Sequence, residues 1–311
     1  MKLLATSVLL TIASLAFFKA EAQDSFQISY RVNTNKSVDF DYQKSDPGTF
    51  TVLLKFNDLT NSLASREQQI TSKNYSGRLL SLTPDNKDNG IGFGYSYTYI
   101  RGKLKPKYNP DFLYLIPYKK DVIVRVAESS FVNATYFGST TPDDWKVYKF
   151  FTKTADTVTA IRKGIVVEVR DLHETDESAD VAYTSKINDL IIEHSDGTLA
   201  SYRGFKKGSI SVKVGETVLP GSNLGINTKT NGNTFYGVSI MLYYLKSVDF
   251  ESAKNANLKT SKSLYGIITP HFSTVESADV IPEPQQEYTS LRNPDVVKKE
   301  LSKKEIAVAI K

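Results

Sequence analysis

The sequence predicts an all-β protein, and three observations lead to this prediction. Tyrosine and phenylalanine are abundant, with 18 Tyr and 16 Phe in 311 residues, and both side chains favour strands. Several stretches alternate apolar and polar residues with a period of two, the pattern of a strand that buries one face. Turn-forming pairs such as Pro47-Gly48, Asn57-Asp58 and Pro220-Gly221 separate these stretches, which is typical of antiparallel sheets.

Composition excludes several classes of protein. Lys and Arg number 39 and Asp and Glu number 34, a net charge of +5 that is too small for a nucleic-acid-binding protein. Hydrophobic residues make up 40% and charged residues 23%, which indicates a globular rather than a disordered chain. Cysteine is absent, so disulfides, thiolate metal sites and Cys nucleophiles are excluded. Histidine occurs three times, as His173, His194 and His271.

Residues 1–22 have the pattern of a secretory signal. Lys2 supplies the positive charge, residues 3–18 are an apolar run, and Ala20 and Ala22 form a small-residue cleavage site. We therefore expect an exported protein, located in the periplasm, outside the cell or at the cell surface. No later apolar run is long enough to span a bilayer, so we expect no transmembrane segment after signal cleavage.

A first domain is predicted over residues 23–137, as an antiparallel β-sandwich. Its strands are expected at residues 26–32, 50–56, 93–99 and 122–126, where the period-two pattern is clear. One of these strands places four aromatic side chains on one face, which would form either the core of the sandwich or a platform for sugar rings. The four are Phe93, Tyr95, Tyr97 and Tyr99.

A second β domain is predicted over residues 138–250. It begins with a Gly-, Ser-, Thr- and Pro-containing connection, after which strand patterning resumes. The rest of the chain, residues 251–311, is expected to be irregular and to end in a basic helix. Asn293 suits the helix cap and Pro294 suits the first helical position. This helix would either pack weakly on the body of the protein or contact a membrane surface or the cell wall.

Four segments of the second domain, taken in order, resemble the lysostaphin-like (LytM-type) zinc endopeptidases, which cut peptidoglycan cross-bridges. Shared features include the turn glycine Gly164, the hairpin residues His194 and Gly197, and the glycines Gly215 and Gly221. The resemblance implies a lysostaphin-like domain built as a β-sheet or barrel sandwich. The four segments are residues 157–167, 188–198, 201–209 and 212–225.

The resemblance also implies where a zinc site would lie. Members of the family bind one zinc ion through a His-x-x-x-Asp motif before the first strand and a His-x-His motif on the last, with a catalytic His between them. Here residues 145–152 contain neither His nor Asp, Gly204 stands at the place of the catalytic His, and residues 236–244 offer only tyrosine. A hydrolytic zinc needs three protein ligands and an open position. We therefore expect no zinc, no other cofactor and no catalytic residue.

The family's cleft would keep its shape without the metal. Tyr202, Arg203, Tyr236 and Tyr243 lie in or near the segments that line it, so they are the candidate ligand-binding residues. Aromatic faces stack on sugar rings, and Arg pairs with carboxylates. The alternative is that these tyrosines are ordinary packing residues of a sheet.

The function that follows is a non-catalytic lysostaphin-like peptidase homologue. It would bind peptidoglycan or regulate a cell-wall hydrolase such as an amidase, since some relatives of this kind are amidase activators. One alternative is a surface carbohydrate-binding or adhesin-like β protein. The other is an active zinc metalloendopeptidase that acts on peptidoglycan with relocated ligands. No nucleic-acid partner is expected.

Overall fold

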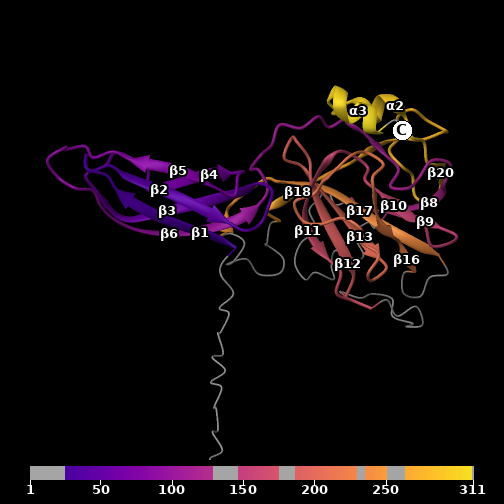
Figure 1. Ribbon diagram of the computed structural model, residues 1–311, viewed down its shortest axis with the longest axis horizontal. Helices are drawn as coiled ribbons and strands as arrows, with labels where there is room; N and C mark the ends of the chain where they lie inside the picture. Colours follow the sequence, from indigo (N-terminus) through magenta and orange to yellow (C-terminus); the bar gives the residue numbers. More distant parts are fainter. Residues whose placement is uncertain (1–24, 129–145, 175–185, 230–234, 251–262, 310–311) are drawn as a thin grey trace, which may run out of the picture.

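The computed structural model describes residues 25–128, 146–174, 186–229, 235–250 and 263–309, and these residues form an all-β protein, as predicted. Figure 1 shows an elongated body made of the first strands beside a broader body that contains the later strands and two short helices. The signal sequence and the domain boundary at residues 137–138 lie outside the described residues. None of the described helices has the length and apolar character needed to cross a bilayer.

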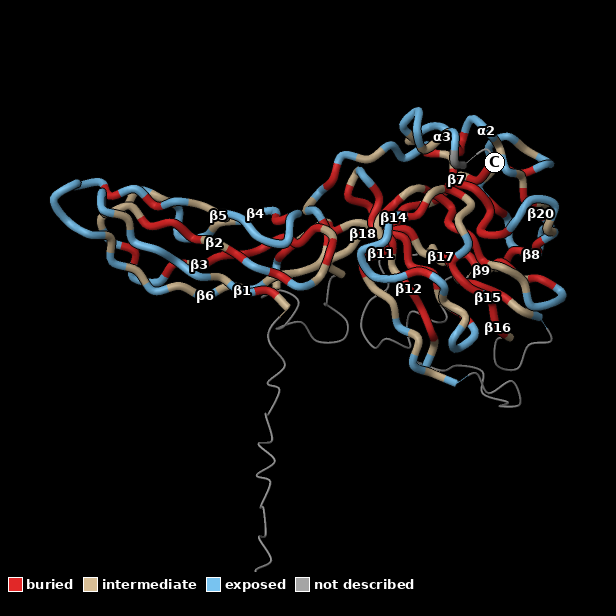
Figure 2. Tube along the Cα trace, viewed as in Figure 1, coloured by how far each residue is buried: buried red, intermediate tan, exposed pale blue. Residues whose placement is uncertain are grey.

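The elongated body is a sandwich of two antiparallel three-stranded sheets, β1-β2-β5 and β4-β3-β6. Alternate residues of the central strands, such as Phe40, Leu54 and Phe56, are buried between the sheets. Figure 2 shows the buried residues along the inner strands of this body and the exposed ones at its tip. The strands are β1 (Phe26–Val32), β2 (Val38–Lys44), β3 (Phe50–Thr60), β4 (Glu67–Ser72), β5 (Ser76–Leu82) and β6 (Gly92–Arg101).

The aromatic residues of β6 belong to the core of this sandwich. All four are half-buried and pack against its two apolar clusters. The Tyr95 hydroxyl donates to the carbonyl oxygen of Ile28 at 3.3 Å, and the Tyr97 hydroxyl donates to that of Phe26 at 3.3 Å. The rings therefore join β6 to β1 across the sandwich, which answers the question left open between core and sugar platform in favour of the core.

The broader body is organised around one ten-stranded sheet. Its main order is β14-β11-β12-β13-β17-β9-β8-β20, with β16 and β18 also paired to β17, while β10-β15 and β19-β7 form two small separate sheets. The strands are β7 (Leu113–Leu115), β8 (Ile123–Glu128), β9 (Tyr148–Thr152), β10 (Thr157–Thr159), β11 (Gly164–Arg170), β12 (Asn188–Glu193), β13 (Leu199–Phe205), β14 (Thr217–Val218), β15 (Asn223–Ile226), β16 (Thr228–Lys229), β17 (Tyr236–Leu245), β18 (Tyr265–Ile268), β19 (His271–Ser273) and β20 (Glu287–Thr289).

Two segments lie in the large sheet although the sequence did not place them there. Strand β8 was expected in the sandwich, but it pairs with β9 and β20. Its alternation of buried Val124 and Val126 with exposed Ile123 and Arg125 predicts a strand, and it does not say which sheet the strand joins. The segment expected to be irregular supplies β18 and β20 to the large sheet and β19 to the small β19-β7 sheet, and all three strands are too short to show a clear period.

The end of the chain forms two short helices rather than one, α2 (Pro294–Lys298) and α3 (Lys303–Ala309). Asn293 caps α2 as predicted, because its side chain accepts from the backbone N–H of Asp295. The second helix begins at a capping box in which Ser302 N donates to the Glu305 carboxylate at 2.8 Å and Glu305 N donates to the Ser302 hydroxyl at 3.4 Å. Such a box favours a new helix start, so the chain leaves α2 before it.

A buried carboxylate joins the two bodies. Glu193, at the end of β12, accepts hydrogen bonds from the backbone N–H of Thr49 at 2.6 Å and from the Thr49 hydroxyl. The neighbouring Gly48 has a φ of 83°, and a Cβ added there would lie 2.6 Å from Glu193 Oε2. Burial lowers the pKa of the adjacent Lys44 to about 8, and the charge of Glu193 opposes that shift. The β2–β3 turn is thus held against Glu193 of the large sheet by the two hydrogen bonds of Thr49 and by the close approach of Gly48.

Replacing Glu193 with leucine should lower the free energy of unfolding by about 2 kcal/mol, because the N–H and hydroxyl of Thr49 would lose their acceptor in a buried place. Urea denaturation followed by circular dichroism measures the change. Glu67→Leu is the control, since Glu67 pairs with Lys55 at 3.6 Å on the surface and should cost about 0.5 kcal/mol or less. Equal losses in the two variants would contradict the assigned role of Glu193.

Candidate functional site

One face of the large sheet bears a row of polar side chains that crosses five strands. Residues directly opposite one another on paired strands point to the same side of a sheet. The pairings Lys149↔Ser239, Ser239↔Arg203, Asp189↔Arg203 and Arg170↔Asp189 therefore place these side chains on one face. The other face buries the main apolar core. We call this set the basic row; its members are Lys149, Ser239, Arg203, Asp189 and Arg170.

Lys149 is the most unusual member of the basic row. Its ammonium lies 5.0 Å from the centre of the Phe151 ring, on the same strand. Burial lowers the pKa of Lys149 to about 8, and no acidic group among the described residues offsets that shift. A half-buried ammonium without a counter-ion is stabilised by any anion that binds beside it.

Asp189 lies between Arg170 and Arg203 and is incompletely bonded. Its Oδ2 atom is 3.7 Å from Arg170 Nη1 and 3.7 Å from Arg203 Nε, too long for hydrogen bonds. Asp189 Oδ1 and Arg203 Nε are both buried without a hydrogen-bond partner. Burial raises the pKa of Asp189, and the two arginines oppose that rise. The centre of the row therefore has an unused donor and an unused acceptor.

Two aromatic rings flank the row. Phe151 and Phe235 lie edge to face with their centres 6.4 Å apart, and Phe235 is 36% exposed. The guanidinium of Arg125 lies 5.5 Å from the centre of the Phe235 ring. Cations beside exposed rings suit a ligand that has both carboxylates and ring faces.

Of the four predicted site residues, only Arg203 is in the basic row. Tyr202 is fully buried on the opposite face, where its hydroxyl accepts from the backbone N–H of Ile161 at 3.0 Å. Its ring is therefore a core element and cannot stack on a ligand in this structure.

The other two tyrosines also lie away from the row. Tyr243 is buried against Tyr265, with ring centres 5.2 Å apart. Tyr236 is half-buried, with the Lys229 ammonium 5.6 Å from its ring centre. Sequence reasoning missed Lys149 and Asp189; the alternation of β9 could have put Lys149 beside Phe151, but the pairing across five strands was needed to join it to Arg203.

The position of the family's catalytic His has no room for a side chain. Gly204 has a φ of 112°, and a Cβ added there would lie 2.8 Å from the carbonyl oxygen of Gly237. Any residue other than glycine would need both a left-handed backbone and a shift of β17.

The other two motif positions are equally unsuited to zinc. Strand β9 places Tyr148 and Phe150 in the core, and β17 places Val238 and Ile240 there. Within the described part of the chain, no group of three or more His, Asp or Glu is arranged to hold a metal ion. The residues at the three motif positions therefore do not fit a zinc ion.

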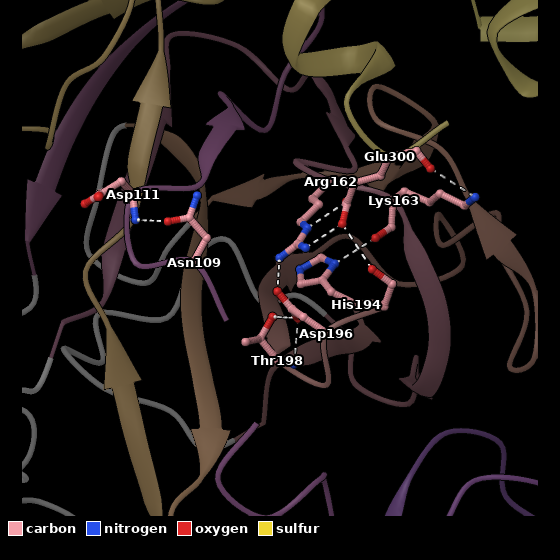
Figure 3. Close-up of polar contacts among 9 residues, drawn as sticks. Asn109, Asp111, Arg162, Lys163, His194, Asp196, Thr198 and Glu300 are labelled. Atoms are coloured by element: carbon pink, nitrogen blue, oxygen red, sulfur yellow. Dashed lines mark hydrogen bonds and ion pairs between the residues drawn. The ribbon is translucent and has the colours of Figure 1, made fainter. Parts of the chain in front are cut away.

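A second polar cluster lies where the C-terminal helices meet the large sheet (Figure 3). The Arg162 guanidinium donates to both oxygens of Glu300, at 2.7 and 2.5 Å, and to Asp196 Oδ2 at 2.8 Å. It also lies 3.8 Å from the centre of the Phe112 ring, and only 4% of Arg162 is exposed. Each of its three guanidinium nitrogens donates within the protein, and the bonds to Glu300 fix the link between α2 and α3.

His194 is the buried histidine of this cluster (Figure 3). Its Nδ1 is 2.9 Å from the carbonyl oxygen of Lys163, and since a carbonyl only accepts, Nδ1 has the proton. Nε2 is buried without a partner. Burial and then the charge of Arg162 lower the pKa of His194 to about 4, so it is neutral in the folded protein. Because it is enclosed, its role is structural.

Comparison with solved structures finds peptidases and related proteins. No protein-family model matches the chain, and no curated protein sequence matches it. A zinc-containing peptidase from Vibrio cholerae is 16% identical, with 70% of this chain and 75% of that chain covered and a TM-score of 0.30. A putative peptidase from Pseudomonas aeruginosa is 11% identical (62% and 82% covered, TM-score 0.29), and Csd3 from Helicobacter pylori is 10% identical (78% and 71% covered, TM-score 0.27). The function of this chain is therefore inferred from its own residues and not from these neighbours.

His194 should make stability depend on pH. Its folded pKa of about 4 lies below its ordinary value of 6.5, so the unfolded chain binds the extra proton between these values. Stability should therefore fall as the pH drops from about 6.5 to about 4. In His194→Gln this loss of unfolding free energy, on the order of 1–3 kcal/mol over that pH range, should disappear. Urea midpoints at several pH values measure it, with His173→Gln as the matched control; an unchanged slope in His194→Gln would refute the assignment.

The purified chain without a His tag should not retain zinc. After equilibration with excess zinc and desalting, elemental mass spectrometry should find less than about 0.1 equivalent, because the motif positions lack ligands. About one equivalent, lost when two of the three histidines are replaced, would show that a relocated site exists.

Proposed function

We propose that this protein is an exported, non-catalytic homologue of the LytM-type peptidases that binds peptidoglycan and thereby guides or regulates a cell-wall hydrolase such as an amidase. The observation that carries the proposal is the basic row. Arg203 belongs to one of the four segments that resemble the family, and the large sheet aligns it with Lys149.

The chemistry of the row matches peptidoglycan in two respects. Peptide stems present carboxylates. Lys149 offers an ammonium that has no acidic partner among the described residues, and Arg203 offers a guanidinium on a side chain that is 35% exposed. The glycan presents ring faces, and Phe151 and Phe235 offer partly exposed aromatic rings. Neither group alone selects this ligand, but the two together favour a polymer with both features.

The close packing of the backbone at Gly204, the position of the family's catalytic His, supports a role without catalysis. Zinc-dependent hydrolysis needs the ion to activate a water molecule. At Gly204 a catalytic His would require displacement of β17, the strand that also lacks its pair of His ligands. The active metallopeptidase is therefore the least supported alternative. A surface carbohydrate-binding protein remains the main competitor, and it differs from the proposal in needing no carboxylates on its ligand.

Binding to purified sacculi tests the proposal. Lys149→Glu combined with Arg203→Glu should weaken co-sedimentation of the full mature chain by about tenfold or more, because two cations of the row become anions. Lys73→Glu with Lys87→Glu is the control, since it makes the same charge change at exposed positions of the sandwich. Equal losses in both double variants would mean that only net charge matters. Tight binding to uncharged glycans instead would favour the carbohydrate-binding alternative.

A further inference from the structure

A cavity of about 590 Å³ lies between the sandwich and the large-sheet body, away from the basic row. It is bounded by the outer face of the β4-β3-β6 sheet and by two chain segments, residues 104–105, which follow β6, and residues 246–250, which follow β17. Such a volume is typical of small-molecule sites, which occur preferentially where domains meet.

The floor of the cavity is made of two cross-strand rows on the outer face of the sandwich. Leu53 pairs with Gln69 on one side and with Thr98 on the other, and Lys55 pairs in the same way with Glu67 and Ser96. All six line the cavity. Five of them are polar, so the floor offers hydroxyl, amide and charged groups to a ligand.

Residues 104–105 and 246–250 form the opposite wall. The backbone N–H of Lys105 donates to the carbonyl oxygen of Leu245 at 2.8 Å, so the two parts of the wall are bonded together. Lys105 adopts a φ of 45°, in the left-handed region that lysine rarely occupies.

The wall has two cations, Lys105 and Lys246, and one carboxylate, Asp249, so its net charge is +1. Lys105 and Lys246 both line the cavity, and neither forms an ion pair with an acidic group of the described residues. The half-buried Phe250 adds a ring to the same wall. Two lysines and one carboxylate facing a floor of hydroxyl and amide groups still leave a net positive wall, which suits a ligand that is anionic and rich in hydroxyls.

The cavity is fixed by contacts between the two bodies. The Thr51 hydroxyl donates to the carbonyl oxygen of Gly102 at 2.8 Å and accepts from the backbone N–H of Leu104 at 3.2 Å. Together with the buried Glu193 contact, these bonds hold the wall over the floor. A ligand would therefore enter a site that is already formed, and little ordering would be needed on binding.

We infer that this cavity is a binding site for a short acidic saccharide. The floor is the face of a sheet and not an edge, so it offers no open strand for an extended peptide to pair with. An apolar ligand would leave the polar floor and the two lysines unpaired, which costs binding free energy. A saccharide with a carboxylate satisfies the lysines, its hydroxyls satisfy the floor, and Phe250 can stack on a sugar ring.

Isothermal titration calorimetry on the full mature chain tests this inference. The probes are trigalacturonate, neutral galactotriose and a tri-glutamate peptide. Trigalacturonate should bind, and about tenfold or more weaker binding is expected of Lys105→Glu combined with Lys246→Glu. Ser96→Trp should reduce binding equally, because it fills the cavity without a change in charge. Lys73→Glu with Lys87→Glu is the charge-matched control and should bind as the parent does.

Four outcomes would overturn the inference. They are no binding of trigalacturonate at millimolar concentration, equal binding of galactotriose, equal or tighter binding of tri-glutamate, and unchanged binding in Ser96→Trp. If binding were lost instead in Lys149→Glu with Arg203→Glu and kept in the cavity variants, the ligand would belong to the basic row. The sacculus experiment uses only that pair of substitutions, so the two proposals can fail independently.

Discussion

Strand β17 is the constraint on which the large sheet depends, because both of its edges are paired. β13 and β16 bond to one edge, and β9 and β18 divide the other between them. This arrangement brings Lys149 and Arg203 to opposite sides of Ser239, although they are far apart in the sequence. It also presses Gly237 of β17 against Phe151 of β9, where a Cβ would lie 3.1 Å from the ring. The pairing of β17 therefore decides which charged and aromatic side chains become neighbours on this face of the large sheet.

The same sheet also explains why the residues at the three motif positions do not fit a metal ion. A hydrolytic metal site needs ligand side chains that converge from neighbouring strands. Here the corresponding strands use Tyr148 and Ile240 for packing, and at Gly204 the backbone comes so close to β17 that no side chain fits. Apolar packing thus occupies the space that ligands would need. The opposite face instead has charged groups and aromatic rings, Lys149, Arg203 and Phe151 among them.

Charged groups buried between elements fix the larger arrangement. Glu193 positions the sandwich through Thr49, and Arg162 positions the end of the chain through Glu300. Both are enclosed and hydrogen-bonded at several atoms, so removal of either partner leaves a buried group without its counterpart. The Glu193–Thr49 contact and the hydrogen bond from Lys105 N to the Leu245 carbonyl oxygen both join the two bodies beside the cavity. Apolar packing alone would stabilise the bodies without specifying their relative position.

The sequence by itself determined the β class, the sandwich and the cap at Asn293, because alternation, turns and caps are local patterns. Only the tertiary structure decided that β8 belongs to the large sheet, that Tyr202 is core, and that Lys149 joins Arg203. The physical reason is that a period of two gives each strand two faces, but strand order decides which face is covered and which residues become neighbours.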